Sequence, residues 1–173
     1  GPDGLRRIAM RVQRLTSIFV AGLRSAGVDV PAATWFDTVR VHVPGNAQTV
    51  LAAARERGIN LRAIDDDTVG VSFDEVSTRE DVELLWEAFG VRADLAALEG
   101  APAGIPADAA REGELLPHPV FNRYHTEHEM LRYLRRLADR DLVLDRTMIP
   151  LGSCTMKLNA TSEMLPVSWP EFA

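Results

Sequence analysis

Two runs of alternating apolar residues, 38–43 and 69–73, constrain this chain most, because each predicts a strand with one buried face. A third predicted strand, 61–64, is separated from the second run mainly by three aspartates, 65–67. So short a connection forms a turn and leaves no room for the crossover that parallel neighbours need. We therefore expect the strands to form one mainly antiparallel sheet.

Apolar residues at helical spacing precede the strands and predict a helix over 4–26. Asp3 is placed to cap the start of this helix, and Gly27 is placed to end it. One stripe of side chains is expected to be buried along it: Leu5, Ile8, Val12, Leu15, Phe19 and Leu23.

Two further helices are predicted among and after the strands. The segment 47–57 is rich in alanine and is followed by a glycine. A third helix is expected to start where Ser77 and Glu80 have the spacing of a capping box, and to stop at Gly90. The predicted order is a helix followed by β-α-β-β-α, which places the chain in the α+β class.

The composition changes after residue 90. The range 91–117 has little periodicity and contains many Ala, Gly and Pro residues, which predicts a linker. Thr126 and Glu129 then have capping-box spacing for a helix through Asp139. The tail from Asp141 lacks a regular period, and its prolines predict an extended path.

The charge and the cysteine count exclude several kinds of function. A net charge of −6 and a pI near 5.2 leave no surplus of cations for nucleic acid or an anionic membrane. No apolar run approaches the roughly 20 residues of a membrane helix. Cys154 is the single cysteine, so no intrachain disulfide forms, and this usage favours a reducing, cytoplasmic compartment.

Three segments of the second half together resemble one protein family. They are HPVFNRYHTEHEMLRYL at 118–134, MIPLGSCTMKLNA at 148–160 and SWPEFA at 168–173. In this order they resemble the glycine decarboxylases, which are the P-proteins of the glycine cleavage system. Residues 1–90, from GPDGLRRIA through VGVSFDE, also resemble this family.

The resemblance implies a domain organisation. The family has a long chain with two related halves, each of the fold type I found in pyridoxal-phosphate enzymes. By resemblance, 1–90 is the small C-terminal domain of the first half, 91–117 is a linker, and 118–173 is the N-terminal segment of the second, catalytic half. Because one chain runs through the junction, the resemblance implies the fused form of the enzyme.

The resemblance also implies an activity, a cofactor and partners. The whole enzyme decarboxylates glycine with pyridoxal phosphate and transfers the aminomethyl group to the lipoyl arm of H-protein. The expected partners are the H-protein lipoyl domain and the remainder of the P-protein. The parent enzyme is expected to be a dimer and to bind neither nucleic acid nor a membrane. The preference for arginine over lysine indicates a GC-rich bacterial genome.

Lys157 is the single lysine of the chain. Without the family resemblance, Lys157 would be the candidate for the lysine that forms a Schiff base with the cofactor. By resemblance, however, the Schiff-base lysine lies beyond Ala173 in a different motif. We therefore expect the isolated chain to be inactive and to bind no pyridoxal phosphate.

The loop that begins at Gly152 is a candidate rim of the active site. Glycine permits close backbone approach, and two neighbouring hydroxyls can donate to a carboxylate or a phosphate. The alternative is a packing loop whose hydroxyls bond to the backbone, with Cys154 as a small buried side chain and Lys157 at an interface. His125, beside Tyr124, is a further candidate for orienting groups at the site. The full set of candidates near cofactor or substrate is Ser153, Cys154, Thr155, Lys157, Asn159 and His125.

Other polar clusters are weaker candidates. His118, His125 and His128 lack the carboxylate or cysteine pattern that would complete a metal site, so none is expected. The aspartates 65–67 lack the glycine and glutamate of a calcium loop and are better explained as a turn. The arginines 132, 135 and 136 form a basic helical patch that either docks an acidic partner or faces solvent.

A second class of function is a free-standing α/β regulatory module that binds a small ligand. RNA binding is disfavoured, because the strands carry Val39, Val41 and Val71 where stacking rings would be expected. The long tail with LGSCTMKLN argues against a regulatory module, which has no use for such a segment.

Overall fold

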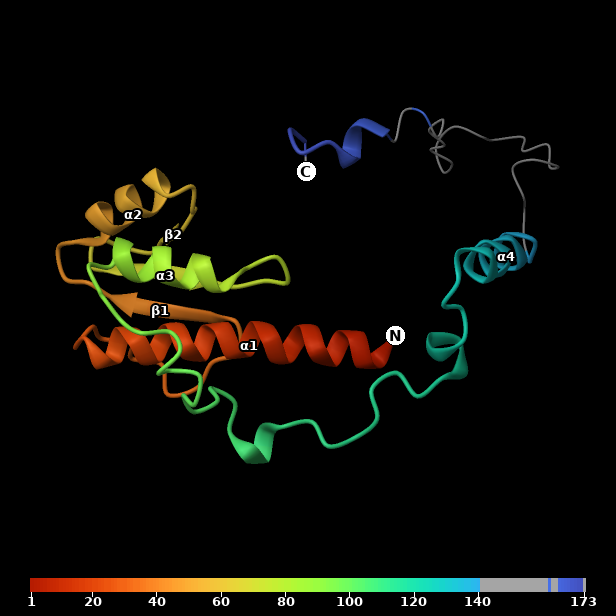
Figure 1. The fold of residues 1–173 in the computed structure, drawn as a ribbon, viewed down its shortest axis with the longest axis horizontal. Coiled ribbons are helices and arrows are strands. Elements are labelled where there is room, and N and C mark those ends of the chain that lie inside the picture. The colour runs from red at the N-terminus through yellow and green to blue at the C-terminus, as the bar shows by residue number, and fades with distance from the viewer. Residues whose placement is uncertain (141–161, 163–164, 173) are drawn as a thin grey trace. The chain divides into compact units, whose positions relative to one another are not determined.

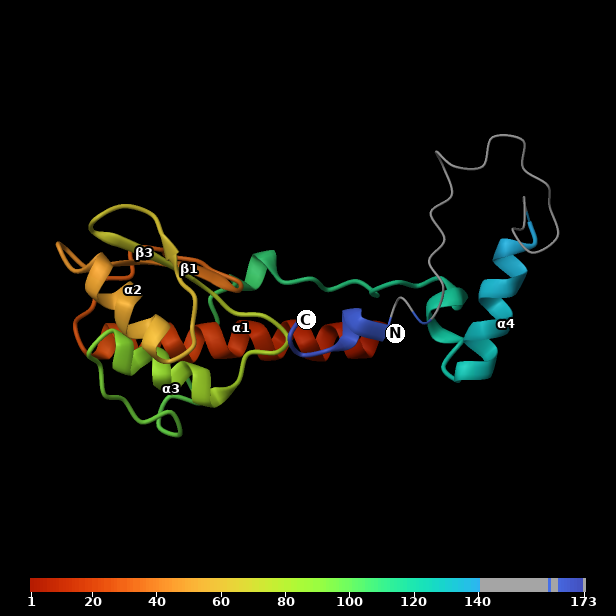
Figure 2. The same cartoon turned by 90° about the horizontal axis from the view of Figure 1, so that it is seen from above.

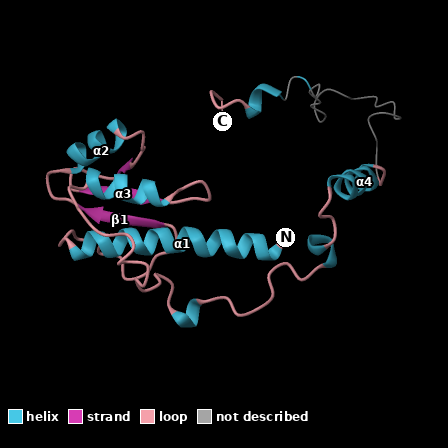
Figure 3. Cartoon of the chain, in the orientation of Figure 1, coloured by secondary structure: helices cyan, strands magenta, loops and turns pink. Residues whose placement is uncertain are grey.

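The computed structural model describes residues 1–140, 162 and 165–172. The chain divides into two compact units, residues 1–122 and 123–173. The elements of both units are drawn in Figure 1, and Figure 3 separates them into helices, strands and loops. Each unit is described by itself.

The strands of the first unit form a single antiparallel sheet. Strands β1 (Thr38–His42), β2 (Arg62–Ala63) and β3 (Thr68–Ser72) lie in the order β1-β3-β2. Val39 pairs with Val71 in the register of β1 and β3, and Ala63 pairs with Val69 in that of β2 and β3. The prediction of one antiparallel sheet is confirmed, and the strand that comes last in sequence is the central one.

The turn between β2 and β3 is closed by aspartate side chains. The Asp65 carboxylate accepts a hydrogen bond from the backbone N–H of Asp67 at 2.9 Å, and this bond lowers the pKa of Asp65. The Asp67 carboxylate accepts from the backbone N–H of Gly45 at 2.6 Å. The three aspartates thus serve as a turn, as the sequence indicated.

Helices α1 (Pro2–Ser25), α2 (Ala47–Glu56) and α3 (Arg79–Ala88) pack on one face of this sheet (Figure 2). Val39, Val41 and Val71 are buried beneath them, whereas Thr38 and Arg40 are exposed on the other face. Alternation along the strands therefore separates core from solvent, as a half-buried sheet requires. The order of elements is the one predicted, a helix followed by β-α-β-β-α.

The start of α1 differs from its prediction. The helix begins at Pro2, with Gly1 as N-cap and no side-chain hydrogen bond to the cap. Proline at the first helical position needs no hydrogen-bond acceptor, so the expected cap from Asp3 is not made, and Asp3 lies inside the first turn. The end agrees: Gly27 has a φ of +79°, and the Val28 N–H donates to the Leu23 carbonyl at 3.0 Å.

The apolar stripe of α1 is buried along only part of its length. Val12 through Leu23 lies in the core, but Leu5 is 49% and Ile8 46% exposed. A helix of 24 residues is about 36 Å long, and α3, with 10 residues, covers about 15 Å. The N-terminal turns of α1 therefore extend past the elements that cover the rest of its apolar face.

The cap of α3 lies one residue later than predicted. Thr78 is the N-cap, accepting from the Asp81 N–H at 3.2 Å, while the Asp81 carboxylate accepts from the Thr78 N–H at 2.7 Å. The expected pair, Ser77 with Glu80, does not form the box, because the Ser77 hydroxyl donates to the Asp74 carboxylate at 2.7 Å. That hydrogen bond lowers the pKa of Asp74.

The chain after Gly90 continues to pack on the first unit, in contrast to the linker expected from residue 91. Val91 and Leu95 are buried in the core. The Arg14 guanidinium donates to the Ala101 carbonyl at 2.6 Å, and the backbone N–H of Trp35 donates to the Gly104 carbonyl at 3.0 Å. These contacts were not predicted, because they involve single side chains and backbone carbonyls and therefore leave no periodic pattern in the sequence. Two short 3-10 helices follow, η1 (Ala107–Ala109) and η2 (Pro119–Asn122).

The second unit contains helix α4 (Glu127–Ala138). Thr126 is its N-cap and accepts from the Glu129 N–H at 3.2 Å, which confirms the predicted start. Within the tail expected to be extended, Leu165–Ser168 instead forms the short 3-10 helix η3. In the parts of the chain that the structure describes, no helix combines the length and apolar character needed to cross a membrane.

Candidate functional site

Most of the predicted site residues lie outside the described residues. The loop 150–159 also lies outside them; we expect it to make few contacts with residues 4–90. Their roles stay predictions. The residues concerned are Ser153, Cys154, Thr155, Lys157 and Asn159.

His125 lies in the loop that precedes α4 and is exposed. Its backbone N–H donates to the Arg123 carbonyl at 3.2 Å, which makes a tight bend before the Thr126 cap. The bend places the neighbouring Tyr124 ring against Tyr133 of α4, with centroids 4.2 Å apart and planes 12° apart. The two rings are stacked.

Arg136 completes this arrangement, which we call the tyrosine–arginine cluster: Tyr124, Tyr133 and Arg136. The Arg136 guanidinium donates to the Tyr124 hydroxyl and lies 5.6 Å and 5.3 Å from the centroids of the Tyr124 and Tyr133 rings. Tyr133 and Arg136 are three residues apart and so share one face of α4. A cation held over two aromatic rings fixes the orientation of the loop that carries His125.

The same contacts use part of the predicted basic patch. Arg136 is engaged by the tyrosines, and Arg135 forms an ion pair with Asp139 at 3.2 Å. Arginines bonded within their own unit are less available to an acidic partner. Stabilisation of the end of α4 therefore explains these two arginines better than docking does.

The tyrosine–arginine cluster was not predicted from the sequence. By helical spacing, Tyr133 shares an apolar side of the helix with Met130, Leu134 and Leu137, and the sequence pattern indicates no partner for Tyr124. The available signal was two tyrosines and an arginine placed so that a loop could fold back on one helix face. Among the described residues, no group of three metal-ligating side chains comes together, and His125 and His128 are both exposed.

The described residues do not fit the covalent site of pyridoxal phosphate. The one lysine of the chain, Lys157, lies outside them, so none of the described side chains supplies the amine that the cofactor aldehyde requires. No chemical step is therefore assigned to them. What they provide is a packed α+β unit and an oriented loop.

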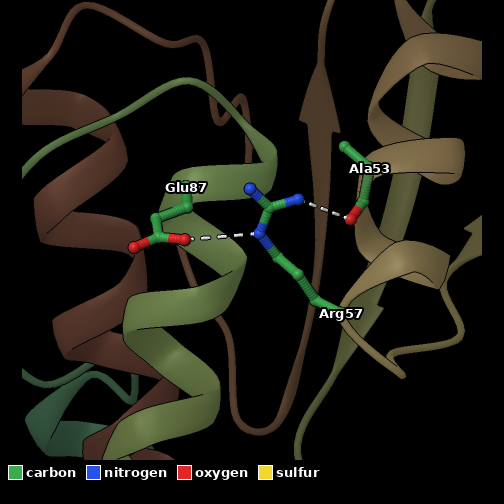
Figure 4. Close-up of polar contacts among 3 residues, drawn as sticks. All are labelled: Ala53, Arg57 and Glu87. Atoms are coloured by element: carbon green, nitrogen blue, oxygen red, sulfur yellow. Dashed lines mark hydrogen bonds and ion pairs between the residues drawn. The ribbon is translucent and has the colours of Figure 1, made fainter.

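One exposed polar contact of the first unit joins two of its helices. The Arg57 guanidinium donates to the Ala53 carbonyl at 2.8 Å and pairs with the Glu87 carboxylate at 3.3 Å (Figure 4). This side chain thus closes the C-terminal turn of α2 and ties it to α3. With the carboxylate more than half exposed, the pair adds at most about 1 kcal/mol.

The comparison with protein families identifies the class of the chain. Residues 1–89, which include the whole sheet and all three of its helices, match the family model of the glycine cleavage system P-protein. The match covers just over half of the chain's 173 residues. The chain belongs to the P-protein family.

The relatives extend the match to the whole chain. It is 57% identical over 175 residues to a protein of Stenotrophomonas maltophilia (strain R551-3) named glycine dehydrogenase (decarboxylating). Proteins of the same name from Xanthomonas euvesicatoria pv. vesicatoria (strain 85-10) and Cupriavidus metallidurans (strain ATCC 43123 / DSM 2839 / NBRC 102507 / CH34) are 58% and 55% identical. These matches cover 99% to 100% of this chain but 18% of each relative.

Proposed function

We propose that this chain is a segment of a glycine dehydrogenase (decarboxylating) that releases carbon dioxide from glycine. One observation carries the proposal: 55% to 58% identity over essentially the entire chain to proteins of that name. By the resemblance noted above, the enzyme uses pyridoxal phosphate and transfers the aminomethyl group to the lipoyl arm of H-protein. The cofactor, when bound, stabilises the electron pair left on the α-carbon.

The proposal gives each part of the chain a place in the longer polypeptide. Residues 1–90 form the small domain of a first fold-type-I half, and 118–173 lead into a second, catalytic half. The antiparallel α+β unit supports the first assignment, because three helices cover one face of its sheet. The candidates at 153–159 would lie near cofactor or substrate, where hydroxyl and backbone donors stabilise anions.

The alternative, a free-standing module that binds a small ligand, is less well supported. The identity to the relatives continues through residues 118–173, whereas such a module needs only the α+β unit. We expect cytoplasmic location and no direct binding to membranes or nucleic acid.

The isolated chain is expected to bind no pyridoxal phosphate stoichiometrically and to release no carbon dioxide from glycine. A working site needs the cofactor lysine, a phosphate site and a partner for the pyridine nitrogen, all held by a large domain. Titration with pyridoxal phosphate, followed by absorbance, should show the same weak response for the wild-type chain and for Lys157→Ala. A saturable one-to-one absorbance band that disappears in Lys157→Ala would contradict this placement of the chain.

The direct test of the proposed function uses a chimera in which this chain replaces the matched segment of the Stenotrophomonas maltophilia relative. The chimera contains every part that the isolated chain lacks. Its activity therefore reports whether this chain does the work of a P-protein segment.

A further inference from the structure

His125 lies between two residues whose side chains are both engaged with helix α4. Before it, the Tyr124 ring stacks on the Tyr133 ring, with centroids 4.2 Å apart. After it, the Thr126 hydroxyl caps the helix by accepting a hydrogen bond from the Glu129 N–H at 3.2 Å. The backbone of His125 is therefore held from both ends by contacts in which its own side chain takes no part.

The packing of this segment is concentrated at the loop that carries His125. Tyr124 and Tyr133 are half-buried, whereas every other residue of the range 123–140 is exposed. Arg136 joins the two tyrosines: its guanidinium donates to the Tyr124 hydroxyl and lies over both rings. The tyrosine–arginine cluster thus orders the bend before the helix, at a cost in side-chain entropy.

The His125 imidazole is exposed, and within the part of the chain that the structure describes it makes no hydrogen bond or ring contact. Two cations lie beside it in the same bend. The guanidinium groups of Arg123 and Arg136 are 5.7 Å and 5.6 Å from the centroid of the Tyr124 ring. An oriented N–H donor with cations nearby is suited to an anionic ligand.

A metal ion is a poorer ligand for this loop. Among the described residues, no three histidine, cysteine, aspartate or glutamate side chains come together. The Glu129 carboxylate accepts a hydrogen bond from the Thr126 hydroxyl at 3.2 Å, so it is engaged within the loop. His125 therefore lacks the further ligands that a bound cation requires.

We propose that the His125 imidazole donates a hydrogen bond to the carboxylate of the amino-acid substrate, and that the tyrosine–arginine cluster positions it for this contact. The inference rests on the proposed function, because the substrate named there, glycine, has no side chain and is recognised largely through its carboxylate. A donor that is ordered before the substrate arrives loses little further freedom on binding. Loss of the positioning contacts should therefore weaken the binding of glycine more than it slows the later steps.

Substitutions in the chimera test the proposal through carbon dioxide release from glycine. His125→Ala should raise the KM for glycine at least about tenfold and change kcat less than about threefold, because the lost contact is made equally in the bound substrate and the transition state. Arg136→Leu should raise KM at least about fivefold when His125 is present. In the His125→Ala background the same change should add less than about twofold, because the residue that Arg136 positions is then missing.

Two further variants accompany this pair. Arg132→Leu is the matched control, because Arg132 is an exposed arginine of the same helix and does not belong to the cluster; KM should stay within about twofold of that of the unsubstituted chimera. Tyr124→Phe keeps the stacked ring but removes the hydroxyl to which Arg136 donates. It should raise KM by a smaller factor than Arg136→Leu, and again only when His125 is present.

Modification of histidines by diethyl pyrocarbonate provides a measurement that does not depend on turnover. At concentrations well above KM, glycine should slow modification of His125 in the chimera at least about fivefold, because bound ligand occupies the imidazole. His128, which is also exposed, should react at the same rate with and without glycine and serves as the internal control. Peptide mass spectrometry separates the two positions, and Arg136→Leu should abolish most of the protection.

Equal losses from Arg136→Leu with and without His125 would overturn the proposal, since that result identifies a merely structural role. A KM that His125→Ala leaves within about twofold would also overturn it, as would equal protection of His125 and His128 by glycine. These results in an active chimera refute the positioning alone. An unsubstituted chimera that releases only background carbon dioxide would refute the proposed function, and this inference with it.

Discussion

Gly22→Ala is expected to destabilise the first unit by about 2 kcal/mol, although alanine is the better helix former. A Cβ at position 22 would lie 2.3 Å from the Trp86 ring, where no such contact is tolerated. Trp86 is 1% exposed, and its indole N–H donates to the Phe19 carbonyl at 3.0 Å. The ring cannot move aside without losing this bond, so the cost of overpacking exceeds the gain in helix propensity of about 1 kcal/mol.

Gly4→Ala is the matched control, because it lies in the same helix with no atom within 4 Å of the added Cβ. It should leave stability unchanged or raise it by up to about 1 kcal/mol. Urea unfolding followed by circular dichroism measures both variants. Equal stability of the two would show that Trp86 does not pack on Gly22.

Phe19→Ala is expected to cost about 4 kcal/mol, the largest effect of any substitution considered. Phe19 is fully buried, with its ring edge-to-face to Phe73 at 5.5 Å and to Phe89 at 5.8 Å. Removing it opens a cavity where α1, the end of β3 and the end of α3 meet, and both aromatic contacts are lost.

The control for Phe19→Ala is Phe36→Ala. Phe36 is 42% exposed, so in the isolated chain its removal should cost about 1 kcal/mol or less. Thermal and urea unfolding of both variants provide the comparison. A loss of stability at Phe36 as large as that at Phe19 would contradict the burial described for the two side chains.

The elements of the first unit follow from short-range patterns, which is why the sequence predicts them well. Alternation placed Val39, Val41 and Val71 on the buried face, and the aspartate turn made β2 and β3 antiparallel neighbours. The pairing of β1 with β3, which makes β3 the central strand, was not predicted from these patterns. Each of these signals lies within a few residues of the structure it specifies.

Features that depend on one residue or on a missing surface were harder to predict. The N-cap of α3 is Thr78 and not the predicted Ser77, because the Ser77 hydroxyl donates to the Asp74 carboxylate. The packing of Val91 and Leu95 lacks a period, and the exposed half of the α1 stripe looks in sequence like a buried one. Helical spacing identifies an apolar face but does not say what covers it.

The candidate site shows the same limit. Stacking of Tyr124 on Tyr133 requires a loop to fold back on its helix, which no local pattern specifies. The candidates at 153–159 came from resemblance to a family and not from spacing, and they lie outside the described residues. Family membership is established for the chain by the comparisons, whereas the roles of these individual residues stay predictions.

The most direct test of the account is the release of labelled carbon dioxide from carboxyl-labelled glycine by the chimera, in the presence of pyridoxal phosphate and H-protein. We expect the rate to be at least about a tenth of that of the unmodified Stenotrophomonas maltophilia relative, a loss of at most about 1.4 kcal/mol in transition-state stabilisation. The relative with the matched segment deleted should show background release. A chimera that is folded and loaded with cofactor, yet releases carbon dioxide no faster than the deletion variant, would contradict the account.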